Sequence, residues 1–294
     1  MENVTGKVAF ITGGANGIGL GIAQAFVNAG MKVVVADIRA EALEAASKRL
    51  AAGGHGDDVM TFELDVTDRA QMKAAADATE ARFGKVHVLV NNAGVGVTGP
   101  VREATYDDWD WGMDVNLGGV LNGIIEFLPR LNAHGEGGHI ISTSSMAAVV
   151  PMQVASIYIT AKSAVLGLME VLRGELRKDG ISTSAFCPGP VQTNISASGE
   201  LRPDKYRNES GLQKYEKQLS ERPNSPLWMS LEECGERVLQ GLRNDDLFIF
   251  THREFKEGFA ERCEKMLASF PDEEINQERY EDIKWLTENP IYRE

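Results

Sequence analysis

Hydrophobic and polar positions along the chain fall into two alternating patterns, short apolar runs and longer segments with the period of a helix. The short runs are rich in β-branched and other apolar residues, which is typical of strands buried on both faces of a parallel sheet. The seven runs are residues 7–12, 32–36, 59–64, 86–90, 139–143, 181–187 and 247–250. Because strands and helices alternate, the pattern predicts the α/β class, with a doubly wound, seven-stranded parallel sheet flanked by helices.

The helical segments differ in how many of their faces are apolar. Residues 20–29 follow the first strand, whereas residues 109–131 and 157–178 are apolar on more than one face. We expect one face of each long helix to cover the sheet and the other to pack against a second subunit.

The first strand leads through a glycine-rich loop, Thr12-Gly13-Gly14-Ala15-Asn16-Gly17-Ile18-Gly19, into the first helix. Glycines at 13, 17 and 19 allow a tight turn, close approach of the backbone to a pyrophosphate, and close packing of helix on strand. The helix N-terminus offers free N–H groups and the positive end of its dipole to phosphates. No Gly-Lys-Ser/Thr follows, so the loop favours a dinucleotide over a nucleoside triphosphate.

The end of the second strand bears on the choice of dinucleotide. Asp37 lies about twenty residues beyond the glycines, where a carboxylate accepts hydrogen bonds from both ribose hydroxyls of NAD. Its charge repels the 2′-phosphate of NADP, and no basic residue occupies positions 14–16. Arg39 lies close by and keeps NADP possible, so the sequence favours NAD without excluding NADP.

Two further strand ends carry candidate cofactor contacts. The third strand ends in Asp65-Val66, placed to flank an adenine ring, and the fourth leads into Asn91-Asn92-Ala93-Gly94. Two amides followed by a small residue and glycine suit a strand end that bonds a neighbouring strand and lets a cofactor pass close. Taken alone, this turn is equally typical of an ordinary loop.

Tyr158 and Lys162 are four residues apart, and Ser145 lies thirteen positions upstream of the tyrosine. If the stretch is helical, Tyr158 and Lys162 share one face. Bringing a tyrosine pKa from about 10 towards neutrality takes roughly 4 kcal/mol, which a unit charge about 4 Å away supplies at an effective dielectric of about 20. One well-placed lysine therefore makes the phenol a usable acid and base. A lone pair of this spacing is also common on helix surfaces, so the glycine-rich loop decides between the two interpretations.

Together these motifs resemble the short-chain dehydrogenase/reductase superfamily in its common Rossmann-fold subtype, over about 190 residues. The matching pieces are Thr12-Gly13-x-x-x-Gly17-x-Gly19, Asp37, Asp65, Asn91-Asn92-Ala93-Gly94, Asn116, Ser145, Tyr158-x-x-x-Lys162 and Pro188-Gly189-Pro190-Val191-x-Thr193. The enoyl reductases of the superfamily are less similar, since they separate the tyrosine and lysine by more residues.

The resemblance implies a catalytic quartet and a nicotinamide cofactor. Tyr158 would exchange a proton with the substrate oxygen, and Ser145 would hydrogen-bond that oxygen. Lys162 would lower the pKa of Tyr158 and hold the nicotinamide ribose, and Asn116 would keep a water that links Lys162 to solvent. The implied cofactor contacts are Gly13, Asn16, Gly17, Ile18, Gly19, Asp37, Ile38, Arg39, Asp65, Val66, Asn92, Ala93, Gly94, Tyr158, Lys162, Pro188, Gly189, Val191 and Thr193. Members commonly form dimers or tetramers through the two long helices, so we expect a homodimer or homotetramer.

Composition narrows the class of protein further. A chain of 294 residues with 43% apolar content supports a substantial core, and with no linker or repeat we expect one domain over residues 1–294. The net charge of −13 disfavours nucleic acid and anionic membranes as partners, and no apolar stretch is long enough to span a bilayer. Three scattered cysteines and the absence of a signal peptide indicate a cytoplasmic protein, and the five histidines have no metal-ligand spacing.

After Asn194 the chain departs from the compact family core. Residues 195–229, the lid segment, carry large apolar side chains among polar ones, and in the superfamily this segment covers the substrate. A long apolar lid indicates a small-molecule substrate that is bulky and largely apolar or aromatic, although each side chain alone is equally explained by packing the lid to the body. Residues 251–294 form a further extension, expected to be helical.

Two capping-box spacings predict where helices start near the end of the chain. They are Ser230 with Glu233 and Thr251 with Glu254.

A narrower resemblance bears on the substrate. Residues 105–111, 115–123 and 194–206 are similar to the sphingomonad Cα-dehydrogenases of lignin β-aryl ether breakdown, NAD-dependent enzymes that oxidise benzylic alcohols. This favours hydride transfer between nicotinamide and a bulky aryl alcohol or ketone. Two alternatives stay open: an NADPH-dependent reductase of bulky ketones, 3-oxoacyl chains or steroids, and a catalytically inactive protein that senses dinucleotides.

Overall fold

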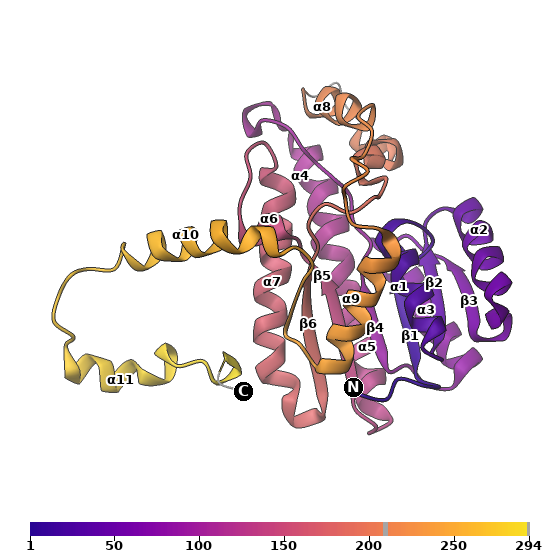
Figure 1. The fold of residues 1–294 in the computed structure, drawn as a ribbon, viewed down its shortest axis with the longest axis horizontal. Coiled ribbons are helices and arrows are strands. Elements are labelled where there is room, and N and C mark those ends of the chain that lie inside the picture. Colours follow the sequence, from indigo (N-terminus) through magenta and orange to yellow (C-terminus); the bar gives the residue numbers. More distant parts are fainter. Residues whose placement is uncertain (208–210, 293–294) are drawn as a thin grey trace.

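The seven apolar runs form one parallel sheet in the computed structural model, which describes residues 1–207 and 211–292 (Figure 1). The strand order is β3-β2-β1-β4-β5-β6-β7, so the predicted α/β class and the doubly wound sheet are confirmed. The strands are β1 (Val8–Thr12), β2 (Lys32–Asp37), β3 (Val59–Glu63), β4 (Val88–Asn91), β5 (Gly138–Thr143), β6 (Ile181–Cys187) and β7 (Phe248–Phe250).

Strand β1 lies inside the sheet and pairs in parallel on both sides. Phe10 is in register with Val34 of β2 and with Leu89 of β4. The chain therefore winds out to β3 on one side, crosses back, and winds out to β7 on the other. Where the order reverses, between β1 and β4, an open parallel sheet leaves a crevice at the carboxyl ends of its strands.

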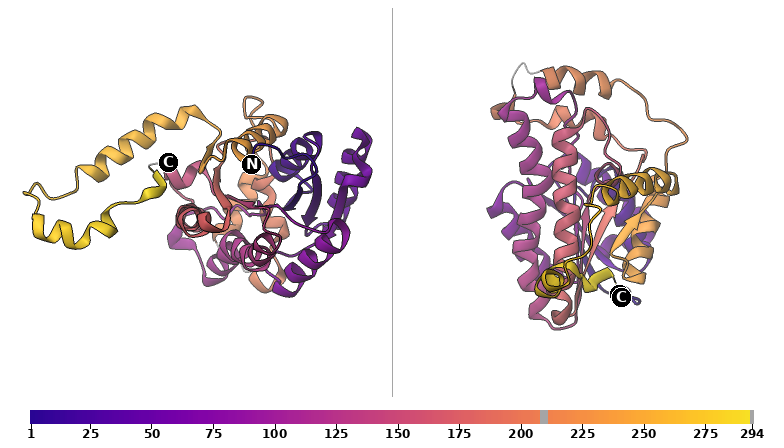
Figure 2. Two further views of the ribbon diagram at one scale, coloured as in Figure 1. Left: turned by 90° about the horizontal axis from the view of Figure 1, so that it is seen from below. Right: turned by 90° about the vertical axis from the view of Figure 1, so that its left-hand side faces the viewer.

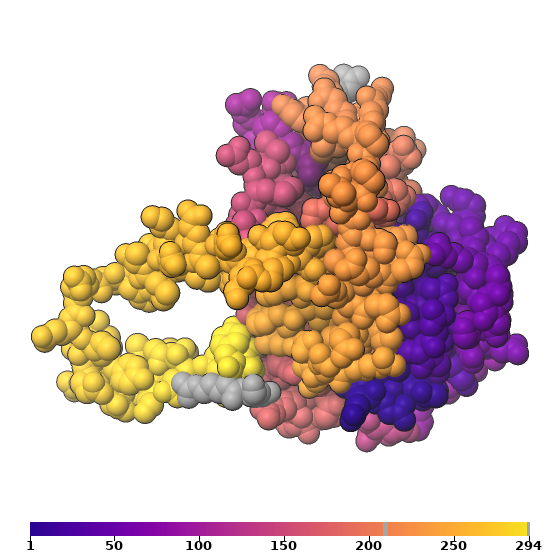
Figure 3. Space-filling model, viewed as in Figure 1, coloured from indigo at the N-terminus to yellow at the C-terminus, as the bar shows by residue number. Residues whose placement is uncertain are grey.

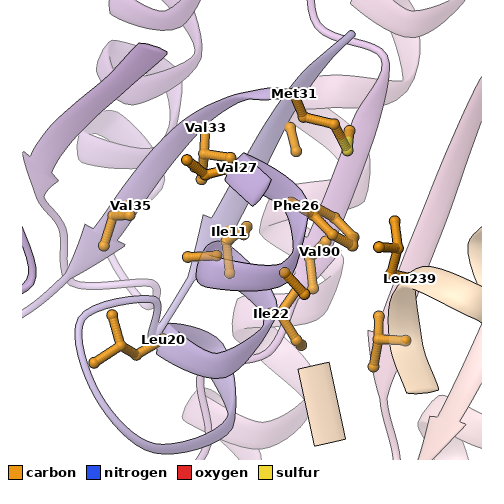
Figure 4. Packing of buried hydrophobic residues seen from close by; sticks show 14 of the residues in the cluster. Ile11, Leu20, Ile22, Phe26, Val27, Met31, Val33, Val35, Val90 and Leu239 are labelled. Atoms are coloured by element: carbon orange, nitrogen blue, oxygen red, sulfur yellow. The ribbon is translucent and has the colours of Figure 1, made fainter. Parts of the chain in front are cut away.

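Helices cover both faces of the sheet, because successive residues of a strand point to opposite sides. On β1, Ala9 and Ile11 face one apolar core, and Val8 and Phe10 face the other. The first core is closed by α1 (Gly17–Asn28), α2 (Ala40–Leu50) and α9 (Leu231–Asn244), and the second by α3 (Arg69–Phe83), α5 (Gly119–Ala133) and α7 (Ser156–Leu176). Figure 4 shows side chains of β1, β2, α1 and α9 interleaving in the first core.

The single helix expected over residues 109–131 is built from three parts. Helix α4 (Tyr106–Met113) continues through one π-helical turn, η4 (Asp114–Gly118), into α5. Helix α4 begins at a capping box in which Thr105 and Asp108 hydrogen-bond each other. Helix α7 lies beside α4 and α5 along the edge of the molecule (Figure 2).

One helix-start prediction is confirmed and one is wrong. Ser230 accepts a hydrogen bond from Glu233 N at 3.0 Å and caps α9. Thr251 does not cap a helix, because its hydroxyl accepts instead from Gly189 N at 2.9 Å. Helix α10 consequently begins only at Lys256, after one short 3₁₀ turn.

The last part of the chain forms an arm that projects from the body. Helix α10 (Lys256–Leu267) leads outward and α11 (Gln277–Thr287) leads back, with an open gap between arm and body (Figure 3). The arm returns to α7, where Tyr292 donates from its hydroxyl to Glu170 Oε1 at 2.6 Å. No helix in the described residues has the length and apolar character needed to cross a bilayer.

Short elements complete the chain. They are η1 (Ala51–His55), η2 (Gly56–Asp58), η3 (Val101–Glu103), α6 (Met146–Val149), η5 (Arg177–Asp179), η6 (Ile195–Leu201), η7 (Asp204–Tyr206), α8 (Gly211–Ser220), η8 (Arg253–Phe255) and η9 (Pro290–Tyr292). Elements η6, η7 and α8 lie in the lid segment, and α8 stands at the top of the view in Figure 1.

Candidate active site

A cavity of about 630 Å³ lies at the carboxyl ends of the strands, where the strand order reverses. Residues that follow β1, β2, β3, β4 and β6 line one part of it, and residues 193–206 of the chain line another. The cavity therefore joins the predicted dinucleotide end of the chain to the lid segment.

The glycine-rich loop after β1 is shaped so that no side chain blocks the cavity. Gly13 and Gly17 have positive φ angles of 60° and 52°, which glycine adopts without strain. A Cβ on Gly13 would lie 2.9 Å from Ala93 Cα, and a Cβ on Gly19 would lie 2.1 Å from the Gly13 carbonyl oxygen. Asn16 caps α1 by accepting from Gly17 N at 2.7 Å. The loop thus presents bare backbone and a helix N-terminus to the cavity.

Asn92 ties this loop to the neighbouring strand end. Its side-chain nitrogen donates to the carbonyl oxygens of Thr12 and Gly13 at 3.1 and 3.2 Å. The Thr12 hydroxyl accepts from the backbone nitrogens of Asn92 and Ala93. These bonds hold the β1 and β4 ends together, as the amide-rich turn predicted.

Asp37 and Arg39 form one unit at the end of β2. The buried Asp37 carboxylate accepts from Ala15 N at 3.3 Å and from Arg39 N at 3.2 Å. The Arg39 side chain pairs with the same carboxylate, with Nε 3.2 Å from Oδ1. The guanidinium that could attract a 2′-phosphate is therefore engaged by the carboxylate that repels one.

Asp65 and Val66, after β3, both line the cavity as expected. Asp65 Oδ1 accepts from the backbone nitrogen and the hydroxyl of Thr67, at 2.9 and 2.8 Å. A Cβ on Gly119 would lie 2.7 Å from Val66 Cγ2, so α5 supports this turn closely from behind.

Tyr158 and Lys162 lie together on the first turns of α7 and line the cavity. The Lys162 ammonium is 5.7 Å from the centre of the Tyr158 ring and donates to the Thr143 carbonyl oxygen at 2.8 Å. Burial lowers the pKa of Lys162 to about 8. Burial also raises the pKa of Tyr158, and a hydrogen bond with Ser145 opposes that rise. In this structure burial rather than Lys162 therefore dominates the pKa of Tyr158.

Ser145 and Asn116 do not line the cavity themselves, but each bonds a residue that does, Tyr158 and Val95 respectively. Ser145 begins α6, where its hydroxyl accepts from Ala147 N at 3.1 Å. Asn116 lies in η4 and is fully buried, and its side-chain amide bonds both the nitrogen and the oxygen of Val95, at 3.1 and 3.0 Å. A Cβ on Gly94 would lie 2.8 Å from Asn116 Oδ1 and 3.3 Å from Lys162 Nζ, so these two side chains approach each other at Gly94, while Ser145 hydrogen-bonds Tyr158.

Comparison with known proteins agrees with this geometry. A family model described as short chain dehydrogenase matches residues 7–203. The chain is 38% identical over 279 residues to a C alpha-dehydrogenase of Sphingobium sp. (strain NBRC 103272 / SYK-6), covering 95% of this chain and 91% of the relative. The chain belongs to the short-chain dehydrogenase family.

Two solved structures of the family resemble this one over nearly their whole length. A short-chain dehydrogenase/reductase from Burkholderia phymatum in complex with NAD has a TM-score of 0.85 and 33% identity, covering 94% of this chain and all of that one (100%). The apo form of LigO from Sphingobium sp. strain SYK-6 has a TM-score of 0.76 and 37% identity, covering 98% and 99% of the two chains. This short-chain dehydrogenase is therefore a nicotinamide-dependent oxidoreductase acting on alcohols, and the open glycine cradle fits such a cofactor.

Three of the expected cofactor contacts do not line the cavity. Gly19 packs against the loop from behind, and Val191 is buried in the first apolar core. Gly189 turns its nitrogen to Thr251, and a Cβ on it would lie 2.6 Å from His252 Nδ1. These residues shape the walls, whereas Pro188 and Thr193 of the same turn reach the cavity.

Other lining residues were not identified from the sequence as site residues. Before the lid segment they are Glu41, Leu64, Thr67, Val95, Trp111, Val115, Thr143 and Asn194, and within it Ile195, Ala197, Ser198, Glu200, Leu201, Pro203, Lys205 and Tyr206. The lid residues could have been identified as lining residues, because the segment after the Pro-Gly turn was expected to cover the substrate. Trp111 belongs to a stretch that carries the narrower resemblance, but its helical period is equally that of a core residue, so the sequence did not identify it as a lining residue.

Within residues 1–207 and 211–292, three potential metal ligands meet away from the cavity, namely His87, His134 and Glu136. The nitrogens of both rings already face hydrogen-bond partners, and Lys7 and Lys85 both pair with Glu136. A divalent cation would have to displace these bonds and share the site with two ammonium groups. The group is an ion-pair cluster at the opposite end of the sheet.

Proposed function

We propose that the enzyme interconverts a bulky aryl secondary alcohol and its ketone, with NAD as the favoured cofactor. The observation that carries the proposal is the convergence of Tyr158 and Lys162 on a cavity whose other wall is the apolar lid segment. The bound nicotinamide supplies or accepts the hydride. The chain's own residues hold the substrate and move the proton.

Tyr158 is the acid and base of the proposed mechanism. Its phenol exchanges a proton with the substrate oxygen, and the hydrogen bond with Ser145 holds the phenol in place. Ser145 shares its hydroxyl with the substrate oxygen and stabilises charge that develops there. A phenol is already protonated at neutral pH, and burial raises the pKa of Tyr158 further above its ordinary value, so the residue is ready to donate to a ketone.

Lys162 and Asn116 act from behind the phenol. The Lys162 ammonium is fixed by the Thr143 carbonyl, and with a pKa of about 8 it is mostly cationic at neutral pH. It is positioned to hold ribose hydroxyls and to supply positive charge beside Tyr158. Asn116 fixes the backbone of Val95, which lines the cavity, and remains the proposed holder of a water that links Lys162 to solvent.

Asp37 supports the preference for NAD. The carboxylate lines the cavity next to the α1 N-terminus and neutralises Arg39, so the net charge offered to a 2′-phosphate is small. The relative from Burkholderia phymatum, which binds NAD, supports the same choice. NADP remains the alternative because Arg39 lines the same cavity.

The substrate class rests on the lid segment. The 38% identity to the C alpha-dehydrogenase covers 95% of this chain and so includes the lid, where substrate contacts lie. Ile195, Leu201 and Tyr206 line the cavity beside Trp111, an apolar and aromatic set that suits an aryl group better than a sugar.

We further propose that residues 1–294 act as one domain in a cytoplasmic homo-oligomer. The free thiols Cys187, Cys234 and Cys263 support a reducing compartment. The exposed apolar residues Ile125 and Val171 on α5 and α7 support a subunit interface along these helices.

A panel of benzylic alcohols and aryl ketones, each tested with NAD(H) and NADP(H) by the absorbance of reduced nicotinamide, tests the proposal. We expect turnover to be highest with an aryl carbinol and NAD. Tyr158→Phe should lower kcat by at least about 10³-fold while NADH still binds, since the proton donor is lost. A protein that only senses dinucleotides would be indifferent to that substitution, and higher activity on 3-oxoacyl chains or steroids with NADPH would support the other alternative.

A further inference from the structure

A buried ion cluster, formed by Asp108, Arg202 and Glu216, attaches the lid segment to α4. Arg202 donates from Nη1 to Asp108 Oδ1 at 2.8 Å and from Nη2 to Glu216 Oε1 at 2.7 Å. The exposed fractions of the three side chains are 0% for Asp108, 1% for Arg202 and 5% for Glu216. They come from α4, from the link between η6 and η7, and from α8, so the cluster exists only while the lid lies on the body.

The cluster has a fixed end and a movable end. Asp108 Oδ2 accepts from the nitrogen and from the hydroxyl of Thr105, both at 2.8 Å, so the start of α4 holds this carboxylate independently of the lid. Arg202 and Glu216 both belong to the lid segment. The lid also contacts the body through the hydroxyl of Tyr206, which donates to Asp114 Oδ2 at 2.7 Å.

The guanidinium lies directly behind the cavity wall. Its Cζ atom is 4.3 Å from the centre of the Trp111 ring, a cation–π distance, and Trp111 lines the cavity. The two chain neighbours of Arg202, Leu201 and Pro203, line the cavity as well, whereas Arg202 does not. Any effect of Arg202 on substrate must therefore pass through the position of these three wall residues.

Stability alone does not account for the ion cluster. Burying one cation with two carboxylates costs desolvation free energy that their attraction only partly recovers. Apolar contact between lid and body is already supplied by a cluster in which Leu212 of α8 packs with Val95, Val97, Trp111 and Ile157 of the body. Apolar contact is non-directional, whereas a planar guanidinium that bonds two carboxylates permits a single arrangement. The ion cluster therefore fixes the position of the lid segment relative to α4.

We propose that Arg202 is a positioning residue for substrate selection, which holds Trp111, Leu201 and Pro203 as a fixed wall against a bulky aryl substrate. The inference rests on the proposed function, because it assigns the wall that recognises the aryl group. A small alcohol that does not reach this wall is independent of Arg202. Tyr158 carries out the proton transfer, which does not depend on the position of the lid. Arg202 therefore affects KM for bulky substrates and not kcat.

The test compares Arg202→Lys with the wild-type enzyme on a two-ring benzylic alcohol and on 2-butanol. Lysine keeps the charge but cannot bridge both carboxylates as the guanidinium does. We expect KM for the two-ring alcohol to rise about tenfold, with its kcat and the KM for 2-butanol within about twofold of wild type. Trypsin should cleave the NADH-bound variant faster at Lys205, Arg207, Lys214 and Lys217. The matched control is Arg222→Lys, an exposed lid arginine, which should behave as wild type in each assay.

An equal rise in KM for both alcohols, or unchanged selectivity with unchanged proteolysis, would overturn the proposal. If Arg202→Lys does not bind NADH, Glu216→Ala replaces it, because that variant keeps the Arg202–Asp108 pair. A smaller but still selective rise in KM is then expected, and wild-type selectivity would overturn the idea. Should the wild-type enzyme oxidise no alcohol, the proposed function fails, and proteolysis of the NADH-bound variants still decides whether Arg202 holds the lid.

Discussion

At the scale of single residues, Asp37 has two roles in cofactor choice, and a single substitution removes both of them. Its carboxylate is the acceptor expected for the ribose hydroxyls of NAD, and it is also the counter-ion that engages Arg39. Removing the carboxylate therefore removes an acceptor and releases a guanidinium in the same cavity. Both consequences shift the preference from NAD towards NADP, the first by weakening the binding of NAD and the second by strengthening that of NADP.

We expect Asp37→Ser to change the cofactor preference from NAD towards NADP. Loss of charge-assisted hydrogen bonds, worth about 1.5–3 kcal/mol, should raise KM for NAD about 10- to 100-fold. KM for NADP should fall, because Arg39 is free to bond a 2′-phosphate. The measurement is the ratio of kcat/KM for the two cofactors with one aryl alcohol.

The double variant Asp37→Ser with Arg39→Gln is the control for this prediction. It should keep the loss with NAD and lose the gain with NADP. If the double variant used NADP as well as the single one, Arg39 would have no part in cofactor choice.

At the scale of elements, helices α1 and α9 pack so closely that two glycines are required where they meet. A Cβ on Gly235 would lie 2.1 Å from the Gly21 carbonyl oxygen, and a Cβ on Gly21 would lie 2.2 Å from the Leu231 carbonyl oxygen. Both obstacles are backbone atoms, so neither can move aside as a flexible side chain would. We expect Gly235→Ala to lower the free energy of unfolding by about 1–3 kcal/mol through overpacking.

Urea unfolding followed by circular dichroism measures this change. The matched control is Glu236→Ala, an exposed position on the same helix, which should shift the free energy of unfolding by no more than about 0.5 kcal/mol. Equal stabilities for the two variants would show that the helices separate without cost.

The lid segment should also respond to pH through Glu216. With the lid docked, burial raises the pKa of Glu216 to about 7 despite Arg202, and Asp108 adds to the rise. Glu216 therefore holds a proton more tightly when the lid is docked than when it is open. The free energy that this proton contributes to docking is fully present below about pH 4.5 and is lost as the pH rises through about 7. KM for a bulky aryl alcohol, divided by KM for 2-butanol, should rise up to about tenfold between about pH 6 and pH 8.

Glu216→Gln is the variant that isolates this effect, because a neutral amide of the same size replaces the protonated acid. Its KM ratio should be independent of pH over the same range. A wild-type ratio that stays flat, or a variant ratio that still rises, would contradict the assignment to Glu216.

The sequence predicted those elements whose cause is local. Each strand is a continuous apolar run, and the shape of the glycine-rich loop follows from three residues, Gly13, Gly17 and Gly19. The π-helical turn that places Asn116 has no local pattern, since residues 109–131 read as one continuous helix. The Thr251 hydroxyl was misassigned because its partner, Gly189, lies 62 residues away.

In the candidate site, too, features with a local cause were predicted and features that depend on distant residues were not. Helical spacing predicted that Tyr158 and Lys162 share one face, and in the structure both lie on α7 and line the cavity. The pKa of Tyr158 could not be predicted, because burial by surrounding elements outweighs one neighbouring charge. The ion cluster around Arg202 joins three segments that are far apart in the chain, and no local pattern in the sequence predicts that they come into contact.

At the scale of the whole molecule, the described residues include exposed apolar side chains on helices α5 and α7 and on the arm. Helices α5 and α7 expose Ile125 and Val171 by 66% and 58%, and both helices are visible side by side in Figure 2. The arm exposes Met266, Leu267, Phe270, Ile275, Trp285 and Leu286. Apolar side chains gathered on one side of a molecule mark interaction surfaces more often than scattered ones do. The arm returns to α7 at Tyr292, so both surfaces border the same helix.

We therefore expect Val171→Glu to break the proposed homo-oligomer. A carboxylate at this position would be desolvated without a partner when α7 packs against a second subunit, which costs several kcal/mol and weakens the association. Sedimentation equilibrium should give the mass of a dimer or tetramer for the wild-type chain and that of a monomer for the variant, with NADH binding retained. Leu227→Glu is the matched control, because Leu227 is 93% exposed and belongs to the lid segment rather than to α5 or α7. A wild-type chain that sediments at 32.1 kDa would contradict the interface, since that is the mass of one subunit.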